Sequence, residues 1–215
     1  METMKLMPAR VKIVSILKKA LFSGEYKSGD ELSLSEISRK LGVSRTPVRE
    51  AFQQLESEGL IELRMNKGAI VKPIGERYIR DHYEMRILLE SEAVRRAAVN
   101  GMEAADGLLK RLYSVQSMVD TISTDEYENL NLEVHTSIWS AARNARLYKF
   151  LSSLWNGPSI GHTTSKLEHY EKSTAEHIAI LEAIKAASAD KAKREMERHI
   201  ERGMNNILKS YNFIQ

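Results

Sequence analysis

Two short helical segments joined by a glycine turn restrict the fold of this chain more than any other feature. The run Ser33–Glu36 has the spacing of a capping box, in which a hydroxyl and a carboxylate three residues later satisfy free amides at a helix start. We expect this helix to run to about Leu41, where Gly42 ends it in the left-handed conformation. A second helix is expected from Ser44 to about Glu58. Two short helices around a tight turn predict a helix-turn-helix.

The flanking segments extend this motif to a winged helix. An earlier helix is expected from Pro8 to Gly24, with an apolar face of Val11, Val14, Leu17 and Leu21 and with Lys12, Lys18 and Lys19 mostly outward. Beyond the motif, the strand-like runs 60–64 and 69–72 flank a short turn that ends in a glycine, which predicts a β-hairpin. This order predicts a winged helix-turn-helix domain over residues 1–75, ending at Pro73-Ile74-Gly75.

The rest of the chain, residues 76–215, is expected to be an all-α helical bundle. No convincing strand run occurs there, and the apolar periodicity predicts helices over 76–99, 102–121, 124–142, 145–156, 173–188 and 190–211. Residues 157–172 are compatible with either a loop or a helix. The predicted fold class is therefore mostly α, with a winged helix-turn-helix followed by a helical domain.

Composition and charge exclude several classes of protein. The chain has no cysteine, which excludes disulfides, thiolate zinc fingers and a cysteine nucleophile. It has no apolar run long enough to span a membrane and no signal-peptide pattern, so we expect a cytoplasmic protein without membrane contact. Residues 1–75 carry a net charge of +4 and residues 76–215 a net charge of −1, a weak indication that the first domain binds nucleic acid.

The second helix of the motif has a polar face suited to the major groove. Its apolar residues Val48, Ala51, Phe52 and Leu55 point inward, while Arg45, Arg49 and Gln53 follow one another at i, i+4 and i+8 with Thr46 beside them. Arginine can bind guanine through two hydrogen bonds, and glutamine can pair with adenine. Ser44 and the helix N-terminus could hold a phosphate, and Lys67 in the hairpin could reach the DNA backbone.

Three histidines of the predicted bundle lie on apolar helix faces. Asn131 and His135 share one face, and His177 and His199 lie on two further helices. His177 and His199 are 22 residues apart around residue 188, so an antiparallel hairpin turning there places them at the same level. Imidazoles that meet inside a helical core form either a divalent-metal site or a set of hydrogen-bonded core residues, and the spacing leaves both open.

Other polar residues of the bundle have less specific interpretations. Arg86, on the same stripe as Tyr83, could bind the carboxylate of an effector or form an ion pair with Glu90, and both roles are compatible. His82, His162 and His169 match no clear role; His169 could lie near the pocket, but a position at the surface is preferred. Glu133 and Glu176 are expected to point away from the histidines, which argues against a general base and hence against an enzyme.

The run Gly42–Phe52, followed by Leu55, Glu58-Gly59-Leu60 and Gly68, resembles the GntR family of bacterial transcription regulators. The resemblance implies that Arg45, Thr46 and Arg49 contact DNA, together with the wing residues Asn66, Lys67 and Gly68. Family members often have an arginine where this chain has Ser35, and Arg39, one turn further on, replaces it only in part. The sequence of the operator is therefore not implied.

The helical domain resembles the FCD effector domain of the FadR-like branch of that family, through Arg86…Leu89-Glu90, Asn131…His135 and Glu176-His177…His199. The resemblance implies a metal held by Asn131, His135, His177 and His199. An Asp is commoner where Asn131 stands, and a neutral amide is a weaker ligand that leaves the site more positive. Imidazole ligands favour Zn or Ni, with Mn also compatible.

The predicted function is that of a DNA-binding transcriptional regulator. The resemblance implies a homodimer on a short palindromic operator, and a small carboxylate effector bound beside the metal, near Arg86 and Tyr83. Two alternatives are a metal-dependent enzyme that uses the three histidines and a metal-sensing regulator without an organic effector.

Overall fold

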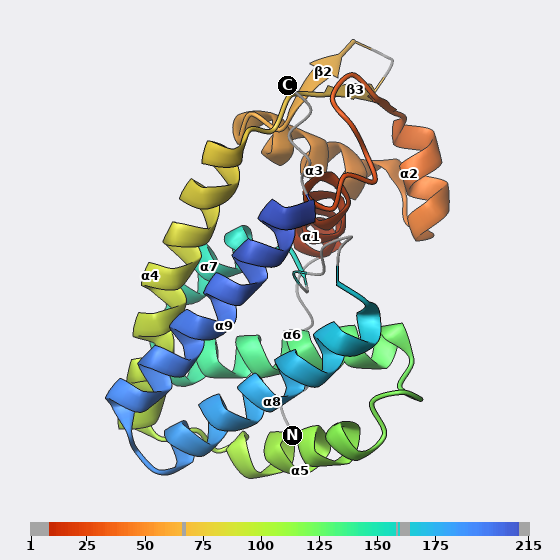
Figure 1. Cartoon of the computed structure of the whole chain (residues 1–215). Coiled ribbons are helices and arrows are strands. Elements are labelled where there is room, and N and C mark those ends of the chain that lie inside the picture. The colour runs from red at the N-terminus through yellow and green to blue at the C-terminus, as the bar shows by residue number, and fades with distance from the viewer. Residues whose placement is uncertain (1–8, 66–67, 158, 160–163, 211–215) are drawn as a thin grey trace.

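The computed structural model describes residues 9–65, 68–157, 159 and 164–210. A small domain with a three-stranded sheet lies at one end of the molecule, and a bundle of long helices forms the other (Figure 1). This arrangement confirms the mostly helical fold class with a winged helix-turn-helix followed by a helical domain.

The N-terminal domain contains the expected elements and one short additional strand. In chain order they are α1 (Ala9–Phe22), β1 (Glu31–Leu32), α2 (Leu34–Leu41), α3 (Arg45–Ser57), β2 (Ile61–Arg64) and β3 (Gly68–Val71). The hydroxyl of Ser33 accepts a hydrogen bond from the Glu36 amide, and Gly42 has a φ of 65°. The cap and the glycine stop of α2 therefore form as predicted.

Strand β1 is the element that the sequence did not predict. It pairs with β3 in an antiparallel sheet of order β1-β3-β2, with Glu31 opposite Ile70 and Leu32 opposite Ala69. A strand of two residues is too short to show alternating hydrophobicity, so no sequence pattern marks it.

Gly68 has a packing role in the sheet, and its predicted contact with DNA stays a prediction. It is buried at the start of β3 with a φ of 100°, and a Cβ atom there would lie 2.0 Å from the Leu32 carbonyl oxygen. Only glycine can approach the β1 backbone so closely. Asn66 and Lys67, the other two predicted wing contacts, lie outside the described residues.

The helical domain contains α4 (Glu76–Asn100), α5 (Ala105–Ser117), α6 (Thr124–Ala141), α7 (Ala145–Leu154), α8 (Lys166–Lys185) and α9 (Ala189–Ser210). Helix α8 begins seven residues before the predicted start, because the Ser165 hydroxyl caps it by accepting a hydrogen bond from the Glu168 amide at 3.1 Å. Helices α4 and α9 lie side by side along much of their length (Figure 1). Within the described residues, no helix is long and apolar enough to cross a membrane.

The two domains meet at a lysine whose predicted orientation was wrong. Lys18 of α1 is fully buried, not outward: its Nζ atom lies 2.6 Å from Glu58 Oε2 and donates a hydrogen bond of 2.8 Å to the Ser153 carbonyl. Burial is tolerated because both partners compensate the charge. The buried apolar side chains of the two domains also belong to a single cluster.

Candidate functional site

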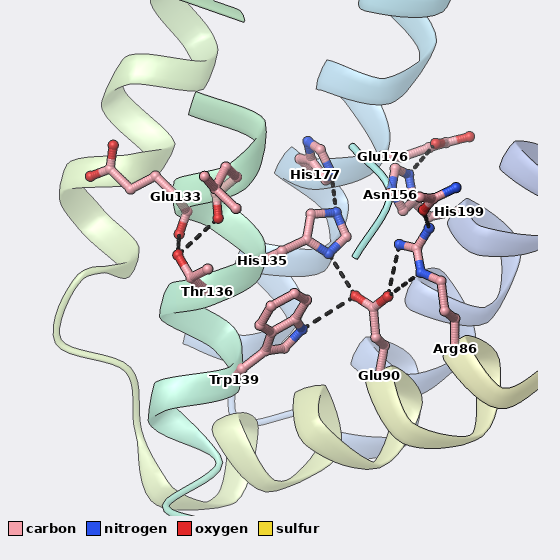
Figure 2. A network of polar contacts seen from close by, with 11 residues as sticks. Arg86, Glu90, Glu133, His135, Thr136, Trp139, Asn156, Glu176, His177 and His199 are labelled. Carbon is pink, nitrogen blue, oxygen red and sulfur yellow. Dashed lines mark hydrogen bonds and ion pairs between the residues drawn. The ribbon is translucent and has the colours of Figure 1, made fainter. Parts of the chain in front are cut away.

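Three buried histidines meet in the centre of the helical domain. His135 of α6, His177 of α8 and His199 of α9 are between 1 and 9% exposed, and one nitrogen of each lies within 4.8 Å of the others. The Nε2 atoms of His135 and His177 are 3.3 Å apart (Figure 2). Neutral imidazole nitrogens at these separations are suited to hold one metal ion.

The α8–α9 hairpin brings His177 and His199 together as their spacing predicts. Helix α8 ends at Lys185 and α9 begins at Ala189, so the turn lies close to the midpoint of the two histidines. Their ring centroids are 4.5 Å apart, which confirms that they lie at the same level.

Glu90 of α4 fixes the orientation of His135. Its Oε2 atom accepts hydrogen bonds from His135 Nδ1 at 2.7 Å and from Trp139 Nε1 at 3.3 Å, while its Oε1 atom accepts one from Arg86 Nε at 2.8 Å (Figure 2). Burial alone would raise the pKa of Glu90, but the charge of Arg86 and the contacts with His135 hold it well below its ordinary value. The carboxylate is therefore ionised, and it orients the His135 ring so that Nε2 lies toward His177.

Glu176 of α8 fixes the orientation of His199. The expectation that Glu176 points away from the histidines was therefore wrong. Its Oε2 atom lies 2.7 Å from His199 Nδ1, and Arg202 donates two hydrogen bonds to the same carboxylate. Burial would raise the pKa of Glu176, but the hydrogen bonds from His199 and Arg202 lower it to about 2. Glu176 points away from His177 on its own helix but toward His199 and Arg202 on the neighbouring α9. Glu133, in contrast, pairs with Arg111, away from the histidines as expected.

The ionisation of the histidines suits metal coordination. Burial lowers the pKa of His177 well below its ordinary value, and the neighbouring His199 and His135 lower it further. Burial also lowers the pKa of His199, despite the hydrogen bond to Glu176. Both rings are therefore neutral near pH 7, which is the form that binds metal.

Asn131, the predicted fourth ligand, lies on the wall of the same site. It is 4% exposed, and its Nδ2 atom has no hydrogen-bond partner among the described residues. A half turn of the amide exchanges its nitrogen and oxygen, so Asn131 can present either atom to the site.

The cavity at the histidines is small. It has a volume of about 10 Å³ and is lined by Asn131, His135 and His199 together with Arg86, Trp155, Gly157, Ser159, His169, Ser173, Ile200, Arg202 and Gly203. This volume is about that of one water-sized probe. The present conformation thus has room for an ion or a water molecule but not for an organic ligand.

Arg86 and Tyr83, the predicted effector contacts, already have protein partners. Arg86 pairs with Glu90, as one of its two interpretations anticipates, and donates from Nη1 to Asn156 Oδ1 at 2.8 Å. The Tyr83 hydroxyl accepts a hydrogen bond from Asn156 and lies 2.6 Å from Ser159 Oγ. Arg86 lines the cavity, whereas Tyr83 does not.

Two further histidines of the helical domain are buried. His169, expected at the surface, is 2% exposed and lines the cavity, because the early start of α8 turns it inward. His82 is packed among Phe22, Tyr78 and Tyr83. His162 lies outside the described residues.

The predicted DNA-contacting face of the motif is open to solvent. Its members on α2, α3 and the turn between them are all exposed, namely Arg39, Ser44, Arg45, Thr46, Arg49 and Gln53. Ser44 is the N-cap of α3 but makes no side-chain cap bond, which leaves free amides at that helix start. Within the described part of the chain, no ion pair engages Arg45 or Arg49.

Comparison with known proteins agrees with this architecture. Residues 9–71 match the bacterial regulatory proteins of the gntR family, and residues 81–202 match the FCD domain. The Uxu operon regulator of Haemophilus influenzae is 29% identical over 209 residues, covering 88% of this chain and 78% of the relative. The Nta operon transcriptional regulator of Aminobacter aminovorans is 26% identical over 194 residues, covering 86% and 88%.

A solved structure shows the same fold. E. coli McbR/YncC matches with a TM-score of 0.72 at 22% identity, over 96% of this chain and all of that one. Because the family and these named relatives are transcriptional regulators, the enzyme alternative is set aside. The chain belongs to the GntR family of bacterial transcriptional regulators, with an N-terminal GntR helix-turn-helix domain and a C-terminal FCD domain.

Proposed function

We propose that this regulator binds operator DNA through α3 and that a divalent metal ion and a small carboxylate in the helical domain modulate this binding. The observation that carries the proposal is the convergence of one nitrogen from each of His135, His177 and His199 within 4.8 Å. Two of these rings are held from behind by the carboxylates of Glu90 and Glu176. Such carboxylate–histidine pairs fix the ligand tautomer at metal sites.

The donor set fits a divalent ion. His135, His177 and His199 supply nitrogen ligands, and Asn131 supplies a weaker oxygen ligand. These donors favour Zn or Ni and remain compatible with Mn. When bound, the ion would offer its remaining coordination positions to the carboxylate of an effector.

The exposed face of α3 supports specific recognition of DNA. We assign base contacts to Arg45, Thr46, Arg49 and Gln53, and phosphate contacts to Arg39, Ser44 and the α3 N-terminus. A homodimer would place two such helices on a palindromic operator, because the two-fold axes of protein and DNA then coincide.

A chain of contacts leads from the histidines to the N-terminal domain. Glu90 binds both His135 and Arg86, Arg86 binds Asn156, and the nearby Ser153 carbonyl accepts the hydrogen bond from Lys18 of α1. Segment 153–156 therefore contacts both the site and the DNA-binding domain. If occupation of the histidine site by a ligand moves this segment, the contact with Lys18 of α1 would change.

A second candidate is a metal-sensing regulator without an organic effector. The cavity volume of about 10 Å³ favours it, because such a space holds an ion but no metabolite unless the site opens. Measurements of operator affinity distinguish the metal sensor from the effector-controlled regulator. They are made on the metal-depleted protein, on the metal-loaded protein and on the metal-loaded protein with carboxylates. A change on metal addition alone supports the sensor, and a further change with a carboxylate supports the effector-controlled regulator. No change in any condition contradicts both.

A further inference from the structure

Four residues that line the histidine cavity carry an unpartnered polar atom. The atoms are Asn131 Nδ2, His169 Nδ1, Ser173 Oγ and Arg202 Nη1, none of which has a hydrogen-bond partner among the described residues. Asn131 and His169 are 4% and 2% exposed, so water outside the protein does not reach them. Buried polar groups without a partner are costly, and they indicate a missing ligand or water.

Glu176 holds the guanidinium group of Arg202 in place and leaves one of its nitrogens without a partner among the described residues. Its Nε and Nη2 atoms donate to the two oxygens of Glu176, and this leaves Nη1 as the unpartnered donor. Arg86 has no comparable unpartnered nitrogen, because its Nε and Nη2 atoms bind Glu90 and its Nη1 atom binds Asn156. Of the two arginines that line the cavity, Arg202 is therefore the better placed to bind an anion.

Arg202 also separates the cavity from a much larger open space. A groove of about 710 Å³ runs along the outer side of α8 and α9 and is lined by Arg202 and Glu176 together with Thr164, Glu168, Lys172, Arg198, Glu201, Asn205, Asn206 and Lys209. The Arg202 side chain is 20% exposed, so it borders both spaces. A small organic ligand that enters from the groove would meet Arg202 at the border of the cavity.

We propose that Arg202 and His169 form the specificity subsite for a small hydroxycarboxylate. The carboxylate accepts a hydrogen bond from Arg202 Nη1, and the hydroxyl pairs with His169 Nδ1. Burial lowers the pKa of His169 to about 3, so its ring is neutral and offers one donor and one acceptor. A hydroxyl can match either role, which a second carboxylate cannot. This inference rests on the proposed function, and it replaces Arg86 and Tyr83 as the effector contacts.

The test uses matched pairs of acids that differ by one hydroxyl: glycolate with acetate, and malate with succinate. Thermal melts and calorimetric titrations are recorded on the full chain, both metal-depleted and zinc-loaded. The variants are Arg202→Gln, His169→Leu and His169→Asn, with Arg198→Gln as the control. Arg198 lines the same groove one turn earlier on α9, but it pairs with Glu195 and does not line the cavity.

The wild type and Arg198→Gln should bind the hydroxy acids in preference to their parent acids. Arg202→Gln should weaken binding of both members of each pair by about tenfold or more, because it removes a charge-assisted hydrogen bond. His169→Leu should remove only the preference for the hydroxyl. His169→Asn, which keeps a polar atom near the position of Nδ1, should restore part of it.

Failure of this inference is distinct from failure of the metal proposal. A wild type that binds none of the four acids, or variants that bind them as the wild type does, would overturn the subsite. A zinc titration of the same proteins decides the metal site separately. If zinc does not bind but Arg202→Gln still removes acid binding, the subsite stands and the metal proposal fails.

Discussion

The ammonium group of Lys18 in α1 donates a hydrogen bond of 2.8 Å to the backbone carbonyl of Ser153 at the end of α7. These residues are 135 positions apart, and their contact joins the DNA-binding domain to the segment that borders the histidine site. The same ammonium lies 2.6 Å from Glu58, just after α3. A single buried cation of α1 therefore contacts the residue that follows α3 and the helical domain.

Replacement of this cation should uncouple the two domains. Lys18→Met keeps the apolar stem but leaves Glu58 and the Ser153 carbonyl without their partner, so we expect a loss of about 1–3 kcal/mol in the free energy of unfolding. Operator binding should persist, but its response to metal and carboxylate should weaken. Denaturant melts and operator titrations check both effects. Lys12→Met, on the same helix but only partly buried, is the control, and an equal response in both variants would contradict the coupling.

Arg49 should contribute specifically to operator recognition. Arg49→Ala should weaken specific binding by about 1–3 kcal/mol if the side chain contacts a base, with little effect on non-specific DNA. Gel shifts with operator and unrelated DNA measure the difference. Arg146→Ala, at another exposed arginine, on α7, should leave both affinities unchanged. Wild-type operator affinity in Arg49→Ala would remove this residue from the recognition face.

Glu90 should raise the metal affinity of a site that it does not touch directly. Glu90→Gln removes the charge that fixes His135, and loss of such an outer carboxylate typically weakens metal binding about 10- to 100-fold. Calorimetric zinc titrations measure the change, and circular dichroism shows whether the fold is retained. Glu133→Gln, on the same helix as His135 but paired with Arg111, should bind zinc as the wild type does. Equal affinities for the two variants would argue that Glu90 serves stability alone.

His82 should make the fold sensitive to acid. Burial lowers its pKa well below the ordinary 6.5, the charges of Lys18 and Arg86 lower it further, and the Leu154 backbone and Glu90 only partly oppose this. Below pH 6.5 the unfolded chain takes up a proton that the folded chain does not. The free energy of unfolding therefore decreases as the pH is lowered through that range. His82 thus stabilises the fold fully only above its unfolded pKa.

His82→Phe removes this titration and keeps an aromatic ring among Phe22, Tyr78 and Tyr83. Its melting temperature should fall less than that of the wild type between about pH 8 and about pH 5. Some pH dependence should remain, because burial also lowers the pKa of His169, His177 and His199. An unchanged pH dependence would show that His82 is protonated in the folded protein.

The sequence predicted those features that depend on local pattern. The cap at Ser33, the stop at Gly42 and the apolar faces of the helices follow from short-range rules, and the hairpin spacing correctly placed His177 opposite His199. These predictions succeed because the helix period fixes which residues share a face.

Features that depend on neighbouring helices were not predicted. Lys18 was expected to face outward, His169 to lie at the surface and Glu176 to point away from the histidines, yet the environment of each is set by another element of the fold. Glu90 was read only as a partner of Arg86, and its contacts with His135 and Trp139 depend on how α4 packs against α6. Helix periodicity gives the direction of a side chain, but not the partner that the packed fold supplies.

The most direct test of the account measures how much zinc or nickel the protein binds. The wild type and His177→Ala are first depleted of metal and then titrated with each ion, and native mass spectrometry counts the bound ions. His177 is the central choice because its Nε2 atom lies 3.3 Å from that of His135 and it has no carboxylate partner of its own among the contacts described above. The account predicts that the wild type binds a single ion, which also raises its melting temperature, and that His177→Ala binds none at the same metal concentration. Equal metal content and equal melting behaviour in the two proteins would show instead that the three histidines are core residues.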